Sequence, residues 1–369
     1  MTRPNETPLA SRLPATVPFV GPEAIERQVG AAFKARLGAN ESVFGPSPRV
    51  LEVIRAAASE AWMYGDPEAY ELRTALSTAL RVTPENIVMG EGIDGLLGYA
   101  VRLFVGPGDT VVTSDGAYPT FNYHVAGFGG DLIKLPYVDD KEDPNTLLEA
   151  AHAHGAKMIY LANPDNPMGS WHRADVINDM IANLPDGCLL VLDEAYVEFA
   201  PEDAVPALDT RNPQVLRMRT FSKAHGLAGM RVGYALGEAS MIRSFEKIRN
   251  HFGLSRLSQA AALAALSDSD WLAYVQRAVE EARRRIAEIA RSNDLRPLAS
   301  ATNFVTIDCG RDASFARAVL DNLMADGIFV RMPFAAPGNR CIRVSVGHPE
   351  ELDLLADLLP KALEQAAAG

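Results

Sequence analysis

The sequence predicts an α/β protein in which a mainly parallel, mixed sheet carries helices on both faces and a smaller α+β domain follows. The first observation is that short apolar runs alternate with helical patterns over residues 87–236, which favours parallel strands joined by helices. The second is that residues 188–192 are almost wholly apolar, as expected for a strand covered on both faces. The third is that the pattern changes after about residue 250, where apolar residues recur at helical spacing.

Each element follows from its local pattern. The large sheet should contain strands at 87–89, 110–113, 157–161, 188–192, 215–219 and 231–236. In the smaller domain, a helix should bury one face from Trp271 to Ile289, and strands should follow at 304–307, 328–331 and 341–346. We therefore expect an N-terminal arm at 1–35, a large domain at 36–250 and a small domain at 251–369. The first twenty residues should be extended, because four prolines there disfavour a helix.

Composition argues against several classes of protein. The formal net charge of -12 argues against nucleic-acid binding, which needs a concentrated positive surface. No segment has the ~18 uninterrupted apolar residues of a membrane helix, and the first residues do not resemble a signal peptide. The three cysteines are scattered and form no CxxC pair, which suggests a reducing, cytoplasmic compartment. His152 and His154 cannot share a helix face, so no metal site is expected.

Polar and aromatic side chains follow the predicted strands at the points where those strands end. Because ligands bind beyond the carboxyl ends of the strands in an open parallel sheet, these side chains should converge on one crevice. They are Gly92 and Asp94, Tyr118 and Phe121, Asn163 and Asn166, Asp193 and Tyr196, and Ser222 and Lys223.

Two of these residues indicate the chemistry of the site. Asp193 ends an apolar run, and a buried carboxylate needs a cationic partner. A protonated pyridine nitrogen is such a partner, although a helix N-cap is an alternative role for Asp193. Lys223 lies near Thr220, Ser222 and Arg231, whose hydroxyls and guanidinium could grip a phosphate. Lys223 could therefore carry a cofactor as a Schiff base, although a lone lysine in a loop is normally a solvated surface group.

Several blocks of the sequence resemble the signature blocks of fold-type I aminotransferases, which depend on pyridoxal 5'-phosphate. These blocks are NPDNPMG at 163–169, DEAY at 193–196, and the segment 222–234, which begins with Ser222-Lys223. The sequence is most similar to the histidinol-phosphate aminotransferases through ANES at 39–42, GPSP at 45–48, YGDP at 64–67 and CIRVSVG at 341–347. The resemblance runs from about residue 19 to 350 and implies a seven-stranded-type sheet and a homodimer.

The resemblance implies a role for each matched residue. Lys223 would bind the cofactor and move the proton at the substrate α-carbon, Asp193 would pair with the pyridine nitrogen, and Tyr196 and Asn166 would hydrogen-bond the ring oxygen. Phe121 would stack on the ring, although it could be an ordinary core aromatic. The phosphate would be held by Thr220, Ser222, Arg231, the backbone amides of Gly92, Ile93 and Asp94, and Tyr64 from the neighbouring subunit.

Substrate binding is expected at the strand 341–346. Its alternation places Ile342 and Val344 on one face and Arg343 on the other. The family uses this arginine to clamp the anionic group of the substrate, and a surface salt bridge is the alternative. Arg331 is a second candidate for this contact, and the early block adds Asn40.

The sequence departs from the family pattern at several places. Gly92-Ile93-Asp94-Gly95 stands where the family usually has Gly-Ser/Ala-Asp-Glu. Phe19 and His124 stand at positions of family tyrosines, and His225 stands where an aromatic residue is common. These changes leave the prediction of the cofactor intact, but they put histidinol phosphate in doubt as the substrate.

The expected activity is transfer of an amino group from an amino acid donor, with glutamate as the first candidate, to a keto or aldehyde acceptor. The substrate could be histidinol phosphate or an aromatic or other amino acid. A decarboxylase on the same scaffold is an alternative, because both reactions use the same electron sink. A non-enzymatic cofactor-binding regulator would need an appended DNA-binding domain, and only about forty residues precede the core.

Overall fold

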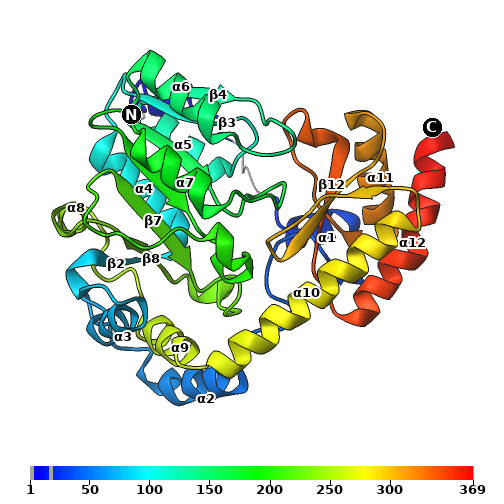
Figure 1. Ribbon diagram of the computed structural model, residues 1–369. Coiled ribbons are helices and arrows are strands. Elements are labelled where there is room, and N and C mark those ends of the chain that lie inside the picture. Colours follow the sequence, from blue (N-terminus) through cyan, green and yellow to red (C-terminus); the bar gives the residue numbers. More distant parts are fainter. Residues whose placement is uncertain (1–3, 16–19, 369) are drawn as a thin grey trace.

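The computed structural model describes residues 4–15 and 20–368 and is built around a seven-stranded sheet (Figure 1). The strand order is β2-β8-β7-β6-β5-β3-β4, in which β8 runs antiparallel to both neighbours and the other pairs are parallel. The strands are β2 (Ile87–Gly90), β3 (Thr110–Ser114), β4 (Asp131–Leu135), β5 (Met158–Ala162), β6 (Leu189–Asp193), β7 (Val215–Thr220) and β8 (Gly233–Leu236). The mixed, mainly parallel sheet that the sequence predicts is confirmed.

Helices cover both faces of this sheet because its inner strands are apolar on both faces. In β6, Leu189 and Val191 pack into one core with α4 (Gly92–Phe104) and α5 (Pro119–Phe128). Leu190 and Leu192 point the other way and pack with α6 (Pro144–His154) and α7 (Ala174–Ala182). The two-residue period of a strand therefore explains why residues 188–192 had to be continuously apolar.

A third group of helices lies beside β2. It consists of α2 (Pro48–Ala57), α3 (Tyr70–Leu80) and α9 (Arg256–Leu266), which share one apolar core with β2 and β8 (Figure 1). The Ser47 hydroxyl accepts a hydrogen bond from the Val50 amide and so caps α2. The helix α9 packs here although it follows residue 250, where we expected the large domain to end. The domain bounds therefore stay a prediction.

The C-terminal part holds a three-stranded antiparallel sheet of order β12-β10-β9. Its elements are α10 (Ser269–Arg291), β9 (Arg296–Pro297), β10 (Phe304–Asp308), α11 (Ala313–Ala325), β12 (Cys341–Ser345) and α12 (Pro349–Ala368). The expected face of α10 is buried, including Val275, Val279 and Ile286. In addition, β1 (Ala35–Arg36) pairs with β11 (Ile328–Phe329), which holds the early chain against the C-terminal part.

The N-terminal arm is only partly extended, so that expectation was wrong in part. Residues Ala10–Arg12 form one 3-10 turn, because the prolines at positions 8 and 14 flank this stretch without interrupting it. Further along, α1 (Pro22–Val29) begins with proline, whose missing amide is not needed in a first helical turn. The expected strand 328–331 also ends early, at Phe329.

After β8, the chain forms the short helix α8 (Ala239–Ser244).

Within the part of the chain that the structure describes, no helix is both long and apolar enough to cross a membrane. Cys188, Cys309 and Cys341 are buried free thiols.

Candidate active site

The polar residues expected at the strand ends do meet at one edge of the sheet. Because β5, β6 and β7 are parallel neighbours, Asp193 lies between the segments that follow Ala162 and Thr220. Since β8 is antiparallel to both β2 and β7, β2 points the same way as β7 and delivers Gly92 to this edge. The reversed direction of β8 brings Arg231, just before its first residue, to the same edge.

Asp193 is a buried carboxylate that accepts its hydrogen bonds from neutral groups among the described residues. Its oxygens accept hydrogen bonds from the Tyr160 hydroxyl at 2.7 Å and the Ala195 amide at 2.9 Å. Burial raises the pKa of Asp193 to about 6, and those two hydrogen bonds only partly oppose the shift. The helix that follows is a short 3-10 turn with Tyr196 at its N-cap position, so Asp193 is not a helix N-cap. The carboxylate therefore suits a ligand that brings a positive charge.

Lys223 and Tyr196 are joined through Asn40. The Lys223 amine donates to the Asn40 carbonyl at 3.0 Å and lies 5.5 Å from the centre of the Tyr196 ring. The Asn40 side-chain amide donates to the Tyr196 hydroxyl at 3.2 Å, and its oxygen accepts from the Ser345 hydroxyl at 2.8 Å. Asn40 adopts a left-handed conformation with φ 56° and is buried, so its two ends are held in fixed directions.

An anion cradle lies beside Lys223. The Ser222 hydroxyl accepts hydrogen bonds from Thr220 at 2.9 Å and Arg231 at 3.5 Å. The Arg231 guanidinium also lies 3.6 Å from the Asp94 carboxylate and directly against Gly92, where a Cβ would be 2.5 Å from it. Because α4 begins at Gly92, the unpaired amides of its first turn face the same place as Arg231. These donors are suited to a phosphate.

The two arginines expected at the substrate site are neighbours. Arg331 and Arg343 pair through their backbones in an antiparallel bridge, which directs their side chains to one face. Arg343 donates to the side-chain oxygen of Asn166 and, at 3.0 Å, to the Gly38 carbonyl. Its Nε is buried and has no partner among the described residues, and burial lowers the pKa of Arg343 to about 10. A partly buried guanidinium with a spare donor suits an anionic ligand.

The aromatic residues are distributed differently from the simplest expectation. Phe121 is fully buried and stacks on Tyr160, with ring centres 4.7 Å apart. The Tyr118 hydroxyl, by contrast, donates to Asp94 at 2.9 Å, so Tyr118 borders the cradle. The sequence placed Tyr118 after a strand but assigned it no role. Tyr64 is 77% exposed and lies against Phe252.

Three further positions are those at which the sequence departs from the family's aromatic residues. His124 bonds the Asp94 carbonyl through its ring nitrogen and packs on Gly98, and burial lowers the pKa of His124. His225 packs on Phe221, and burial lowers its pKa to about 4, so it is a neutral packing residue at neutral pH. Phe19 lies outside the described residues.

Two buried carboxylates that support the site were not predicted from the sequence. Asp165 accepts hydrogen bonds from the Tyr137 hydroxyl and the Met168 amide, and so holds the loop that presents Asn166. Burial raises the pKa of Asp165 to about 7. Its position inside the block 163–169 was the available signal. Glu194, directly after Asp193, is consumed by buried ion pairs with Arg217 and Arg219.

The site asks for two opposite charges at once. Among the described residues, the hydrogen-bond partners of Asp193 supply no cation, whereas Arg231 and the first turn of α4 present donors suited to an anion. A phosphorylated pyridine with a protonated ring nitrogen would meet both demands, and the Lys223 amine could bind its aldehyde. The residues present therefore fit the cofactor that the sequence resemblance implies, and the arrangement is that of a fold-type I aminotransferase.

Comparisons with known proteins agree. A model of the family "Aminotransferase class I and II" matches residues 34–359, and the chain belongs to that family. The histidinol-phosphate aminotransferase of Roseiflexus castenholzii is 35% identical over 352 residues, covering 93% of this chain and 94% of the relative. Histidinol-phosphate aminotransferase 2 of Pseudomonas aeruginosa is 33% identical over 362 residues, covering 96% and 97%.

Solved structures show the same fold. The crystal structure of histidinol-phosphate aminotransferase from Sinorhizobium meliloti in complex with pyridoxal-5'-phosphate is 54% identical, with a TM-score of 0.95 over 98% of both chains. An aspartate aminotransferase of Thermus thermophilus, only 21% identical, has a TM-score of 0.79 over 92% of this chain and 94% of its own, and is similar in fold alone.

Proposed function

We propose that this aminotransferase uses pyridoxal 5'-phosphate to move an amino group from glutamate to a keto acceptor, the carbonyl compound from which histidinol phosphate is formed. The observation that carries the proposal is the pairing of a buried, uncompensated Asp193 with the anion cradle at Arg231 and α4. The relatives named as histidinol-phosphate aminotransferases support the choice of acceptor.

The chain's own residues would divide the work. When bound, the cofactor supplies an electron sink for bonds at the substrate α-carbon. Lys223 would hold it covalently and would move the α-proton at Nζ, with the Asn40 carbonyl to orient the free amine. Asp193 would keep the ring nitrogen protonated, and Tyr196 and Asn166 would hydrogen-bond the ring oxygen.

The phosphate is assigned to one set of groups, and the ring face to another. The set for the phosphate comprises Thr220, Ser222, Arg231 and the amides of Gly92, Ile93 and Asp94. Phe121 keeps its proposed place against the ring, and Tyr118, which borders the cradle, is the second aromatic candidate.

Recognition of the substrate anion is assigned to Arg343, with Arg331 beside it and Asn40 at the inner wall. The buried, unpaired Nε of Arg343 supports this assignment, because an incoming carboxylate or phosphate could accept from it. Both donor and acceptor carry an anionic group, so one clamp can serve both half-reactions.

The active unit is proposed to be a homodimer. Trp62, Tyr64, Tyr70 and Phe252 are exposed aromatic side chains, and an exposed aromatic surface is typical of an interface. Tyr64 would reach the phosphate of the partner subunit from this surface. The three buried thiols support a reducing, cytoplasmic location, and the division at residues 35 and 250 is kept as the proposed domain plan.

A panel of half-reactions tests the proposal. The holoenzyme is mixed with single amino acids, and the cofactor absorbance is followed together with release of CO2. Glutamate and histidinol phosphate should each convert the cofactor to its amine form without CO2. Release of CO2 in step with turnover would replace the proposal with a decarboxylase.

A further inference from the structure

The first turn of α4 departs from the family pattern and is held in an unusual way. Glu91 occupies the N-cap position of α4, but its side chain accepts no hydrogen bond from the amides of the first turn. The usual side-chain cap is therefore absent from a helix end whose free amides belong to the proposed phosphate cradle.

The Glu91 side chain folds over the helix instead. Its carboxylate lies 3.1 Å from the point where a Cβ on Gly95 would stand. Gly95 occupies the position where the family usually has glutamate, and glycine is among the weakest helix formers. Space for the Glu91 carboxylate explains its presence, since any side chain at 95 would crowd that group.

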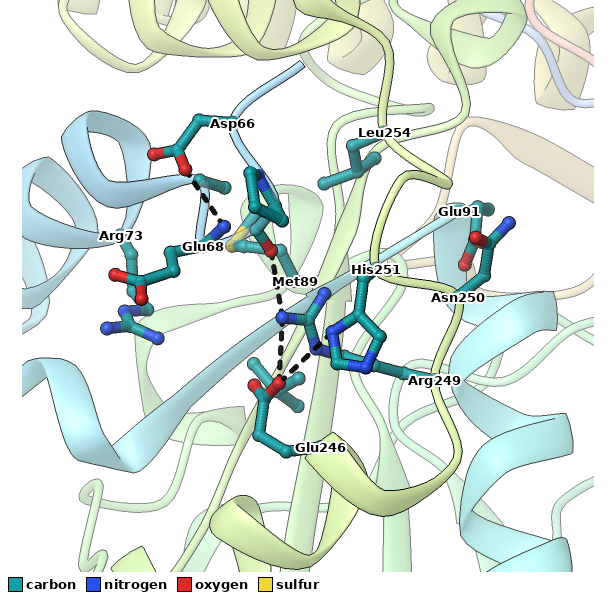
Figure 2. A pocket seen from close by; sticks show the side chains of 14 residues that line it. Asp66, Glu68, Arg73, Met89, Glu91, Glu246, Arg249, Asn250, His251 and Leu254 are labelled. Atoms are coloured by element: carbon teal, nitrogen blue, oxygen red, sulfur yellow. Dashed lines mark hydrogen bonds and ion pairs between the residues drawn. The ribbon is translucent and has the colours of Figure 1, made fainter. Parts of the chain in front are cut away.

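Tyr99 fixes the carboxylate from the other side. Its hydroxyl donates to Glu91 with both oxygens at 3.1 Å, and it accepts a hydrogen bond from the Asn250 amide at 2.9 Å. Gly253 closes the slot, because a Cβ there would overlap the Glu91 carboxylate. Figure 2 shows Glu91 beside Asn250 at a pocket that residues 66–69 and the strand β2 also line.

The segment 249–253, which packs against Glu91, is itself held in place by other contacts. Arg249 donates to the Pro67 carbonyl at 2.8 Å and pairs with Glu246 at 2.8 Å (Figure 2). The Tyr99 hydroxyl thus connects the Glu91 carboxylate, at the start of α4, to a fixed part of the chain.

We infer that Glu91 and Tyr99 are positioning residues that lock the first turn of α4 in the orientation that holds the cofactor phosphate. The inference rests on the proposed phosphate cradle at Gly92 and Arg231. It does not require either side chain to touch the cofactor.

The test measures binding of two ligands to each variant: pyridoxal 5'-phosphate, and pyridoxal, which lacks the phosphate. Glu91→Ala and Tyr99→Phe should release pyridoxal 5'-phosphate about tenfold faster, the size of effect expected when a hydrogen bond to a charged group is lost. Their affinity for pyridoxal should match that of the wild type. Glu91→Gln should stay within about twofold, because the amide oxygen still accepts from Tyr99.

Gly253→Ala provides an independent arm. It adds one methyl group at a position without a positive φ, so its effect should come from displacing the Glu91 carboxylate. It should release pyridoxal 5'-phosphate as fast as Glu91→Ala, and the double variant should be no worse than either single variant. Gly127→Ala, whose Cβ meets nothing within 4 Å, is the matched control.

The outcomes separate the inference from the proposal beneath it. Wild-type release of pyridoxal 5'-phosphate from Glu91→Ala and Gly253→Ala would overturn the inference, and so would equal losses for both ligands. If the wild type itself bound pyridoxal as tightly as pyridoxal 5'-phosphate, the phosphate cradle would fail first.

Discussion

Replacing Arg343 with alanine should remove recognition of anionic substrates while leaving the cofactor site in place. The guanidinium is partly buried, its Nε has no partner among the described residues, and its other two nitrogens donate to Asn166 and the Gly38 carbonyl. Loss of a charge-assisted contact in such a site costs about 2–5 kcal/mol. At ~1.4 kcal/mol per decade, kcat/KM for glutamate should fall about 30- to 4,000-fold.

The assay compares glutamate with an uncharged amine in single half-reactions. The amine should lose little, and Arg343→Lys should restore only part of the activity, because an ammonium cannot reproduce the two-pronged contact. Arg340→Ala is the matched control, since Arg340 neighbours β12 but pairs with Asp140 and Asp308. Equal losses on glutamate and on the amine would mean that Arg343 is structural, and the clamp would be withdrawn.

Three further results are expected. Borohydride should fix the cofactor to Lys223, and Lys223→Ala should be unlabelled and inactive; labelling at another lysine would contradict the assignment. The pKa of Asp193 rises from 3.8 to about 6 on burial, so its stabilising effect is complete below pH 3.8 and is lost as pH rises through about 6. In urea unfolding of the cofactor-free protein, Asp193→Asn should therefore gain about 2 kcal/mol on the wild type between pH 4 and pH 7, and a constant difference would count against an uncompensated charge. Mixing Lys223→Ala with Tyr64→Ala subunits should restore activity through one intact site per mixed dimer, and no recovery would argue against a shared site.

The strands of the large sheet could be predicted where both faces are apolar, as in β6. The edge strand β4 escaped prediction because Asp131–Leu135 is partly exposed and mixes charged with apolar residues. At two residues, β9 is too short to carry a period. The pattern identifies strands that are buried and long enough, including the buried edge strand β2, and it fails where a strand is partly exposed or very short.

The chemistry of Lys223, Asp193 and Arg231 could be predicted because each stands beside a strand end with a distinctive neighbour. Contacts that join distant parts of the chain could not. The bond from Tyr99 to Glu91 spans eight residues, but its meaning depends on Asn250, which is 151 residues from Tyr99. In the sequence Gly95 is only a departure from the family pattern. In the structure, a Cβ at this position would crowd the Glu91 carboxylate.

Asn40 shows why the substrate clamp and the catalytic lysine keep a defined spacing. Ser345 lies two residues from Arg343 on β12 and makes two hydrogen bonds with Asn40. Its hydroxyl donates to the Asn40 side-chain oxygen and accepts from the Asn40 backbone amide. The Asn40 carbonyl accepts from Lys223, and Asn303 on the neighbouring segment also donates to that carbonyl. One residue near the start of the chain is thus bonded both to β12, which carries the proposed anion clamp, and to the amine that would move the proton. The pairing of β1 with β11 secures this early segment, so the geometry of the site depends on residues 35–40 as well as on the sheet.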